Sequence, residues 1–252
     1  MAEAATLPVL LRQLRLTSMA RHVDDVREQA TLQGWGLERT LATLCEHELA
    51  ERERRRLERH LKEARLPPGK TLTSFDLDVL DDAARSRLTA LATDTAWVAQ
   101  AHNLLLFGPS GVGKSHMAAA IGYALIEQGL RVRLYAASTL VQELQTAKQE
   151  LRLAEALGKM DKYEMLIIDD IGYVKRSEAE TSVLFELIAH RYEAGSLLIT
   201  ANQPFSAWDT IFPDDMMAVA AIDRLVHHAQ VIELGGESYR KRHHTQSRKE
   251  TT

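Results

Sequence analysis

The 252-residue sequence contains one cysteine, Cys45, and this scarcity excludes two kinds of site. A single thiol forms no disulfide within the chain, and it cannot build a zinc site of the cysteine type. Proteins of the reducing cytoplasm seldom carry structural disulfides. The cysteine count therefore fits a cytoplasmic protein.

Long apolar runs are also missing. No segment approaches the roughly 18 apolar residues of a membrane helix, and the N-terminus lacks the basic start and apolar core of a signal peptide. The net charge is -4, with 45% hydrophobic residues, as in an ordinary soluble protein with a packed core. DNA-binding domains tend to be basic, so this balance does not by itself indicate nucleic-acid binding. A local basic face is still compatible with an acidic total.

The first 66 residues read as a helical domain. Apolar residues recur at helical spacing in two stretches, and Gly34 and Gly36 mark a turn between them. Pro67, Pro68 and Gly69 cannot continue a helix, so we place a domain boundary here, between residues 1–66 and 67–252. The apolar residues of the helical stretches are Leu10, Leu11, Leu14, Met19, Leu41, Leu44, Leu49, Leu57 and Leu61.

A run of arginines lies in the second helical stretch, interleaved with glutamates. One interpretation is a solvated helix in which opposite charges pair along the surface. The other interpretation is a surface that binds DNA or a partner protein. The charged residues are Glu51, Arg52, Glu53, Arg54, Arg55, Arg56, Glu58 and Arg59.

From residue 104 onward, short apolar runs alternate with amphipathic stretches. Strands without polar alternation are buried on both faces, as in a parallel sheet. Strands that alternate with helices indicate a layered α/β fold. We therefore predict three layers, α/β/α, around a parallel sheet of about five strands. The expected strands are LLLF at 104, VRLYA at 132, MLIIDD at 165, LLITAN at 197 and QVIEL at 230, with helices from 114, 138 and 178.

The segment GPSGVGKSH follows the first of these strands and matches the phosphate-binding pattern G-x-x-x-x-G-K-[ST]. Glycines let backbone N–H groups curl around phosphate oxygens, and the following helix turns its positive end toward the anion. Lys114 would neutralise the β- and γ-phosphates, and the Ser115 hydroxyl would coordinate Mg²⁺. The predicted ATP-binding residues are Gly108, Pro109, Ser110, Gly111, Val112, Gly113, Lys114, Ser115 and His116.

Polar residues also end two later strands. Asp169 and Asp170 close an apolar strand, where two adjacent carboxylates are costly unless a cation or solvent receives them. Asp169 fits the carboxylate on the magnesium side of P-loop enzymes, and Asp170 fits a base that orients the attacking water. Asn202 ends the next strand, where its amide would bind the γ-phosphate or the water. The alternatives are two capping aspartates and a simple turn before Pro204.

Together these motifs resemble the AAA+ ATPases, in the branch of bacterial replication initiators and helicase loaders. The sequence is most similar to the IstB-like helper ATPases of insertion-sequence transposition, from about Arg65 to Arg240 and weakly through the helical N-terminus. DnaC-like helicase loaders share several of these features. The motifs are LPPGKTLTSFD, NLLLFGPSGVGKSHMAAAI, LIIDDIGY, LLITANQP, IDRLVHHAQVIEL and ESYR.

The resemblance implies roles for further residues. Asn202 takes the sensor 1 role. Arg224 is similar to the arginine finger that reaches the γ-phosphate bound by a neighbouring subunit, which requires a homo-oligomer joined through ATP. The alternative is a surface arginine paired with Asp223 or Asp209. Arg240 would serve near the nucleotide or the subunit junction.

The sequence departs from the family pattern in two ways. Asp170 stands where many AAA+ proteins have glutamate, so its carboxylate is one methylene shorter and hydrolysis is expected to be slow or to need a partner. Only about 18 residues follow QVIEL, so the C-terminal helical lid is expected to be reduced or absent.

The sequence also contains basic and histidine-rich segments. The tail YRKRHHTQSRKE suits either contact with the DNA backbone or a solubilising role, and Lys175 and Arg176 lie in a loop that faces either DNA or solvent. Adjacent histidines on a helix point in different directions, so His227 and His228 are not expected to form a metal site, nor is the pair at 243 and 244.

We therefore predict a cytoplasmic ATPase that uses ATP and Mg²⁺, assembles on double-stranded DNA and delivers this target DNA to a transposase. Its helical N-terminal domain would serve self-assembly or transposase contact. The alternatives are a helicase loader with a replicative helicase as partner, and a nucleotide-gated DNA-binding adaptor with negligible turnover. A small-molecule kinase would leave the motif IDRL unexplained.

Overall fold

The computed structural model describes residues 7–77, 80–172, 177–204, 208 and 215–235. The chain divides into two compact units, residues 1–59 and residues 60–252. The bounds of the long helix α3 (Leu37–Ala64) include residues of both units. The domain boundary placed between residues 66 and 67 from sequence lies within the second unit.

The first unit is helical, as predicted. It contains α1 (Leu7–Gln13), α2 (Thr17–Gln33) and most of α3. The turn predicted at the two glycines is confirmed, because Gly34 adopts a left-handed conformation and its N–H closes α2 on the carbonyl of Ala30. A further break between α1 and α2 was not predicted. The buried core of this unit consists of Leu11, Met19, Ala20, Val23, Val26 and Leu44.

A buried carboxylate holds the start of α2. The residue before the helix, Leu16, supplies no side-chain cap. Instead Glu48 of α3 accepts hydrogen bonds from the backbone N–H groups of Ser18, at 2.8 Å, and Met19, at 3.2 Å. Arg52 donates to the same carboxylate at 2.9 Å. Glu48 thus satisfies helix-start donors that otherwise lack a partner, and it ties α2 to α3.

These contacts also set the ionisation of Glu48. Burial alone would raise its pKa, but the hydrogen bonds from Met19, Arg52 and Ser18 and the charge of Arg52 outweigh burial, so the pKa is lowered. The carboxylate is therefore charged in the folded protein at neutral pH.

The arginine-rich stretch of α3 shows the ion pairs of the first interpretation. Glu51 accepts from both Arg54 and Arg55, and these contacts lower the pKa of Glu51 to about 2. Arg52 pairs with Glu48, and Arg56 pairs with Glu53. Exposed pairs of this kind add little stability. They do occupy the guanidinium groups that a DNA-binding surface would present.

The second unit is built on a parallel sheet of five strands, as predicted. Each predicted strand lies within two residues of an observed one. The order across the sheet is β2-β3-β4-β1-β5. The strands are β1 (Asn103–Phe107), β2 (Val132–Ala136), β3 (Met165–Asp169), β4 (Ser196–Ala201) and β5 (Ala229–Glu233).

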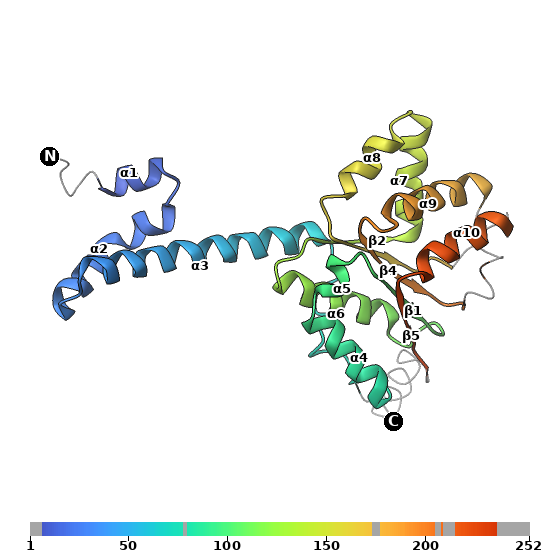
Figure 1. Ribbon diagram of the computed structural model, residues 1–252, viewed down its shortest axis with the longest axis horizontal. Coiled ribbons are helices and arrows are strands. Elements are labelled where there is room, and N and C mark those ends of the chain that lie inside the picture. The colour runs from blue at the N-terminus through green and yellow to red at the C-terminus, as the bar shows by residue number, and fades with distance from the viewer. Residues whose placement is uncertain (1–6, 78–79, 173–176, 205–207, 209–214, 236–252) are drawn as a thin grey trace, which may run out of the picture. The chain divides into compact units, whose positions relative to one another are not determined.

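Helices cover both faces of this sheet, which confirms the three-layer α/β/α prediction (Figure 1). On one face α6 (Lys114–Glu127) contacts β1, β2, β3 and β4, and α4 (Asp82–Thr93) packs on α6, close to the short α5 (Ala96–Ala99). The other face carries α7, α8, α9 and α10, and its core includes alternate residues of the strands, such as Leu105 and Phe107. These helices span Ala137–Gln149, Leu153–Met160, Glu178–Arg191 and Asp215–Val226.

The strand order determines where a ligand can bind. From β1 the chain crosses through α6 to β2 at the far edge, whereas from β4 it crosses in the opposite direction to β5. Right-handed crossovers in opposite directions place α6 and α10 on opposite faces. A crevice forms where two such neighbouring strands end, so the carboxyl ends of β1 and β4 are the expected ligand position.

No helix in the described part of the chain is long and apolar enough to cross a membrane.

We expect Glu48→Gln to destabilise the first unit, because the neutral amide accepts less strongly from two backbone N–H groups and loses the charge attraction to Arg52. The expected loss is about 1–3 kcal/mol, in the range for a charged buried hydrogen-bonding group. The free energy of unfolding, measured by urea denaturation of the full chain, checks this. Glu46→Gln is the control, because Glu46 is an exposed residue of the same helix.

The same contact predicts a pH dependence. The folded pKa of Glu48 lies below its unfolded value of 4.5, so its contribution is complete above about pH 4.5 and is lost as the pH falls through the folded pKa. The stability difference between wild type and Glu48→Gln should therefore shrink in acid. A difference that stays constant down to the acid transition would contradict this assignment.

Candidate nucleotide-binding site

The phosphate-binding pattern forms a tight loop between β1 and α6. Gly108, Gly111 and Gly113 all have positive φ angles, of 145°, 89° and 99°. A Cβ atom on Gly108 would lie 2.2 Å from the carbonyl oxygen of Leu234, and one on Gly113 would lie 2.9 Å from the ring of Phe75. The pattern requires glycine at these two positions for space as well as for backbone conformation.

Lys114 lies inside this loop. Its ammonium group donates to the carbonyl oxygens of Gly108, at 2.7 Å, and Pro109, at 2.9 Å. The side chain is buried, with 8% of the residue exposed. A buried ammonium group anchored on the loop is a fixed positive charge for phosphate oxygens.

Ser115 and the start of α6 complete the loop. Lys114 and Ser115 form the first turn of the helix, so the positive end of the helix dipole lies at the loop. Nine residues of α6 are buried, and the helix is therefore held firmly behind the loop.

The two aspartates lie at the end of β3, next to β4, and a residue that the sequence interpretation overlooked connects them. The hydroxyl of Thr200 donates to Oδ1 of Asp169 at 2.6 Å and accepts from the backbone N–H of Asp170 at 2.8 Å. Thr200 is 1% exposed. A buried hydroxyl among the apolar residues of LLITAN was the available signal, because buried polar groups need partners.

Asp170 itself has a strained and exposed position. Its φ angle is 65°, which is unusual for a residue other than glycine, and its side chain faces solvent. Partial desolvation raises the pKa of Asp170, the charge of Asp169 raises it further, and the ammonium of Lys114 lowers it. A raised pKa and a strained backbone are both typical of functional carboxylates.

Asn202 follows β4, beside the loop that follows β1. Its Oδ1 atom is buried, and among the described residues no donor lies within hydrogen-bonding distance of it. Because buried polar atoms normally have partners, this amide is suited to a ligand such as water or phosphate. The structure thus brings Lys114, Asp169 and Asn202 to one edge of the sheet, as the parallel strands require.

His116 was predicted among the nucleotide-binding residues, and its side chain is directed elsewhere. Its Nε2 atom lies 3.1 Å from the carbonyl oxygen of Thr71 and 3.1 Å from the hydroxyl of Ser74. The ring also packs edge-on against Phe75, with centroids 5.2 Å apart. Since a carbonyl only accepts, Nε2 carries the proton. The imidazole thus fastens the segment around residues 71–75 against the start of α6.

Arg224 lies at the opposite edge of the sheet. It belongs to the last turn of α10, and the carbonyl of its neighbour Leu225 accepts a hydrogen bond from Asn103, the first residue of β1. The loop begins at the other end of β1, about 17 Å away at the usual strand rise. The guanidinium of Arg224 donates to Ala220 at 2.8 Å and lies 5.2 Å from the ring of Phe185.

Three residues considered from sequence, Lys175, Arg176 and Arg240, lie outside the described residues, as does Asp209.

The residues at the carboxyl edge fit a nucleotide and a hard cation. Lys114 and the backbone N–H groups of the loop offer positive charge to phosphates. The oxygens of Ser115 and Asp169 are the type of ligand that Mg²⁺ prefers, and Thr200 orients that of Asp169. The fold and this arrangement define the class of protein as a P-loop nucleotide-binding protein of the AAA+ type.

The family follows from direct comparison. Residues 9–247 match the model of the family described as IstB-like ATP binding protein, and the chain belongs to this family. The match includes the helical N-terminus, where the resemblance from motifs alone was weak.

Individual relatives and a solved structure agree with this family. A Sinorhizobium fredii protein named "Putative insertion sequence ATP-binding protein" is 52% identical over 240 residues, covering 95% of this chain and 80% of the relative. The corresponding insertion sequence IS21 protein of Pseudomonas aeruginosa is 37% identical, covering 93% and 88%. The crystal structure of the DnaC helicase loader has a TM-score of 0.53 at 16% identity, covering 67% of this chain and 98% of that one, which shows a shared fold.

We expect Thr200→Val to loosen this site, because it leaves the N–H of Asp170 without its acceptor and the carboxylate of Asp169 without its donor. Unfolding free energy should fall by about 1–3 kcal/mol. The gain in nucleotide affinity on adding Mg²⁺ should fall about tenfold, as for other outer-shell changes at metal sites. Titration with a fluorescent ATP analogue, with and without Mg²⁺, measures this.

Thr200→Ser is the matched control, because it keeps the hydroxyl. A valine variant with the wild-type Mg²⁺ response would show that Thr200 supports only the fold.

Proposed function

We propose that this protein is an ATPase that regulates transposition: with ATP bound it assembles on double-stranded target DNA and delivers this DNA to the transposase of its insertion sequence. The main support for this proposal is that Lys114, the Asp169–Thr200 pair and Asp170 lie at the same edge of the sheet. The names of the relatives support the link to insertion sequences.

Each residue at this edge has a chemical task in the proposal. The Lys114 ammonium binds β- and γ-phosphate oxygens, and Asn202 offers its buried amide oxygen to the attacking water. Asp170 accepts a hydrogen bond from that water and orients it. Ser115 and Asp169 hold Mg²⁺, which when bound neutralises charge that develops on the phosphates.

The chemistry of Asp170 favours slow turnover. Its carboxylate is one methylene shorter than the glutamate of many AAA+ proteins, so it reaches less far toward the water. Its pKa is raised by desolvation and by Asp169, which keeps it a better base than an ordinary exposed aspartate. In this proposal, slow ATP hydrolysis sets how long the protein stays assembled on DNA before it is released.

The position of Arg224 supports action on a neighbouring subunit. The length of β1 separates it from the phosphate loop of its own chain, so it serves as an arginine finger only between chains. A groove beside it contains exposed apolar side chains, with Met216 83% and Val219 68% exposed. Apolar surface around an arginine is typical of a protein interface. We therefore propose a homo-oligomer with ATP at the subunit contacts.

The first unit is the proposed surface for self-assembly or transposase contact. Its α2 and α3 helices expose leucines that a solitary helical unit would bury, including Leu32 at 79%, Leu37 at 74% and Leu49 at 65% exposed. Four arginines of its charged stretch, Arg52, Arg54, Arg55 and Arg56, are paired with glutamates. We therefore assign DNA contact to the second unit, with the basic tail as the candidate segment. The proposed location is the cytoplasm.

A second candidate function is loading a replicative helicase, which the fold shared with the DnaC helicase loader favours. A third is a nucleotide-gated adaptor on DNA with negligible turnover, which the short carboxylate of Asp170 favours.

Light scattering on duplex DNA tests the proposal. Large DNA-bound assemblies are expected with ATP, and small species with ADP or without nucleotide. Lys114→Ala should stay small in every condition, because it lacks the phosphate-binding ammonium. Assemblies that form with ATP and never disperse as ATP is consumed would favour the adaptor.

A chain that stays monomeric regardless of nucleotide and DNA would contradict the transposition proposal. Assembly that appears only when a replicative helicase is added would then identify a loader.

Mixing two inactive variants tests the finger. Arg224→Ala keeps an intact nucleotide site and Asp170→Asn keeps an intact finger, so each alone should lose at least about 100-fold in ATP hydrolysis. If the finger acts between chains, an equimolar mixture should regain about a quarter of wild-type activity through head-to-tail contacts. Phosphate release measures this.

Arg87→Ala, at an exposed arginine of α4, is the control and should hydrolyse ATP normally. Full activity of Arg224→Ala alone, or a mixture as inactive as its parts, would rule out the finger.

A further inference from the structure

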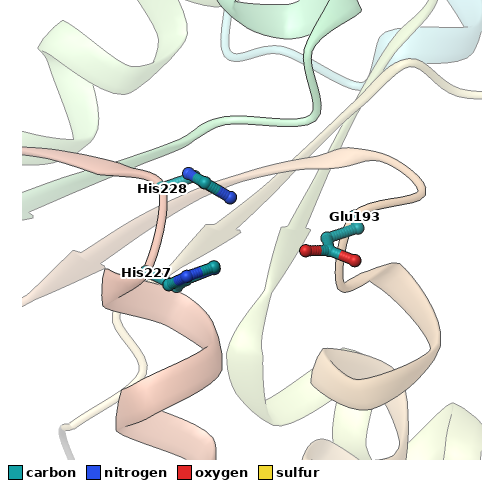
Figure 2. Close-up of side chains that lie close together, drawn as sticks. All are labelled: Glu193, His227 and His228. Carbon is teal, nitrogen blue, oxygen red and sulfur yellow. The ribbon is translucent and has the colours of Figure 1, made fainter.

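A second group of polar side chains lies at the amino edge of the sheet, opposite the phosphate loop. Glu193 follows α9, and His227 and His228 follow α10, so the group joins the connections that lead into β4 and β5. One ligand atom from each side chain lies within 4.8 Å of the other two. Figure 2 shows a carboxylate oxygen of Glu193 turned toward the two imidazole rings.

This geometry differs from the expectation from sequence. Adjacent histidines on a helix were expected to point apart, but α10 ends at Val226, so both histidines lie on the turn beyond it. Their ring centroids are 4.1 Å apart, at an angle of 51°. Glu193 has a positive φ of 55° and lies on the turn that faces them.

Each imidazole contacts one aromatic neighbour. The hydroxyl of Tyr192 lies 2.9 Å from Nδ1 of His227. When this Nδ1–H donates to the hydroxyl, the lone pair of Nε2 is available, which is the arrangement that orients histidine ligands of metals. On the other side, the ring of His102 stacks on that of His228, with centroids 5.2 Å apart and an interplanar angle of 17°.

We propose that Glu193, His227 and His228 bind a divalent transition-metal ion of the zinc class. Two imidazole nitrogens and one carboxylate oxygen match a known zinc ligand set, whereas Mg²⁺ and Ca²⁺ prefer oxygen ligands throughout. All three side chains are exposed, so an ion reaches them directly and water completes its coordination.

The distances require a modest closure. Zinc bonds of 2.0–2.1 Å in a tetrahedron place ligand atoms about 3.3 Å apart. The side chains must therefore approach one another by up to about 1.5 Å, which rotation of exposed side chains on turns provides. The proposal does not depend on the ATPase assignment, because no residue of the phosphate site takes part.

A bound ion would connect two segments that carry other functions. His227 lies three residues after Arg224, at the end of α10, and Glu193 lies in the connection between α9 and β4. The ion would therefore link these two segments. Because the ion binds the folded state, it should also raise the thermal midpoint of unfolding.

Zn²⁺ titration of the metal-free full chain by calorimetry tests this proposal. It is carried out without nucleotide and with excess Mg²⁺, which occupies sites made of oxygen ligands alone. We expect His227→Gln/His228→Gln to weaken Zn²⁺ binding at least tenfold or to remove one ion per chain, and Glu193→Gln to weaken it about tenfold. Tyr192→Phe should lower the affinity without changing the number of ions bound.

The matched control is His22→Gln/His47→Gln. These two histidines of the first unit also stack, with centroids 4.6 Å apart, and they are not part of the grouped cluster. This variant should bind Zn²⁺ as wild type does. Co²⁺ provides a second readout, because its visible absorption reports tetrahedral nitrogen and oxygen ligands and should disappear with the His227 and His228 substitutions.

The proposal is overturned if wild type binds no Zn²⁺ in this titration, if the variants at 193, 227 and 228 bind like wild type, or if the control loses as much affinity as they do. Metal-free variants should unfold at the wild-type temperature, and Glu193→Gln alone decides the question if the histidine double variant does not fold.

Discussion

The carboxyl edge of the sheet, where the nucleotide would bind, depends on the hydrogen bonds of the Thr200 hydroxyl. This hydroxyl joins the ends of two neighbouring strands, because it donates to one acidic side chain and accepts from the backbone of the next residue. Because Thr200 is buried, its hydroxyl needs partners within the protein, and these two groups provide them. The carboxylate of Asp169 is therefore oriented before any ligand binds. The conformational entropy lost in ordering this side chain is lost on folding and not on ligand binding.

Much of this arrangement was predictable from the sequence. The glycines and lysine of the loop and the five apolar runs follow local rules, and parallel strands bring their carboxyl ends to one edge whatever their order. The strand order itself was not predictable, because no local pattern states which strands pair. For the same reason Thr200 escaped notice, since its role exists only when β3 and β4 are adjacent.

At the amino edge of the sheet, the arrangement of Glu193, His227 and His228 was not predictable from the sequence. The rule that adjacent helical histidines diverge is sound, but it applies only inside a helix, and α10 ends one residue before them. Helix ends are the least predictable part of a sequence interpretation. The partner residue, Glu193, comes from a turn 34 positions earlier in the chain, so nothing in the local sequence connects it to the pair. His116 likewise matched a local motif, but its ring is held by a segment some 40 residues away.

The close approach of Gly108 to Leu234 has a mechanical consequence. In the described part of the chain, β5 is followed by a hydrogen bond from the N–H of Leu234 to the carbonyl of Phe107, at 2.7 Å, directly before the phosphate loop. Because Gly108 has no side chain, its backbone lies close to the carbonyl oxygen of Leu234. A displacement of the backbone at Leu234 would therefore be passed directly to the phosphate loop, and a displacement of the loop would be passed to Leu234.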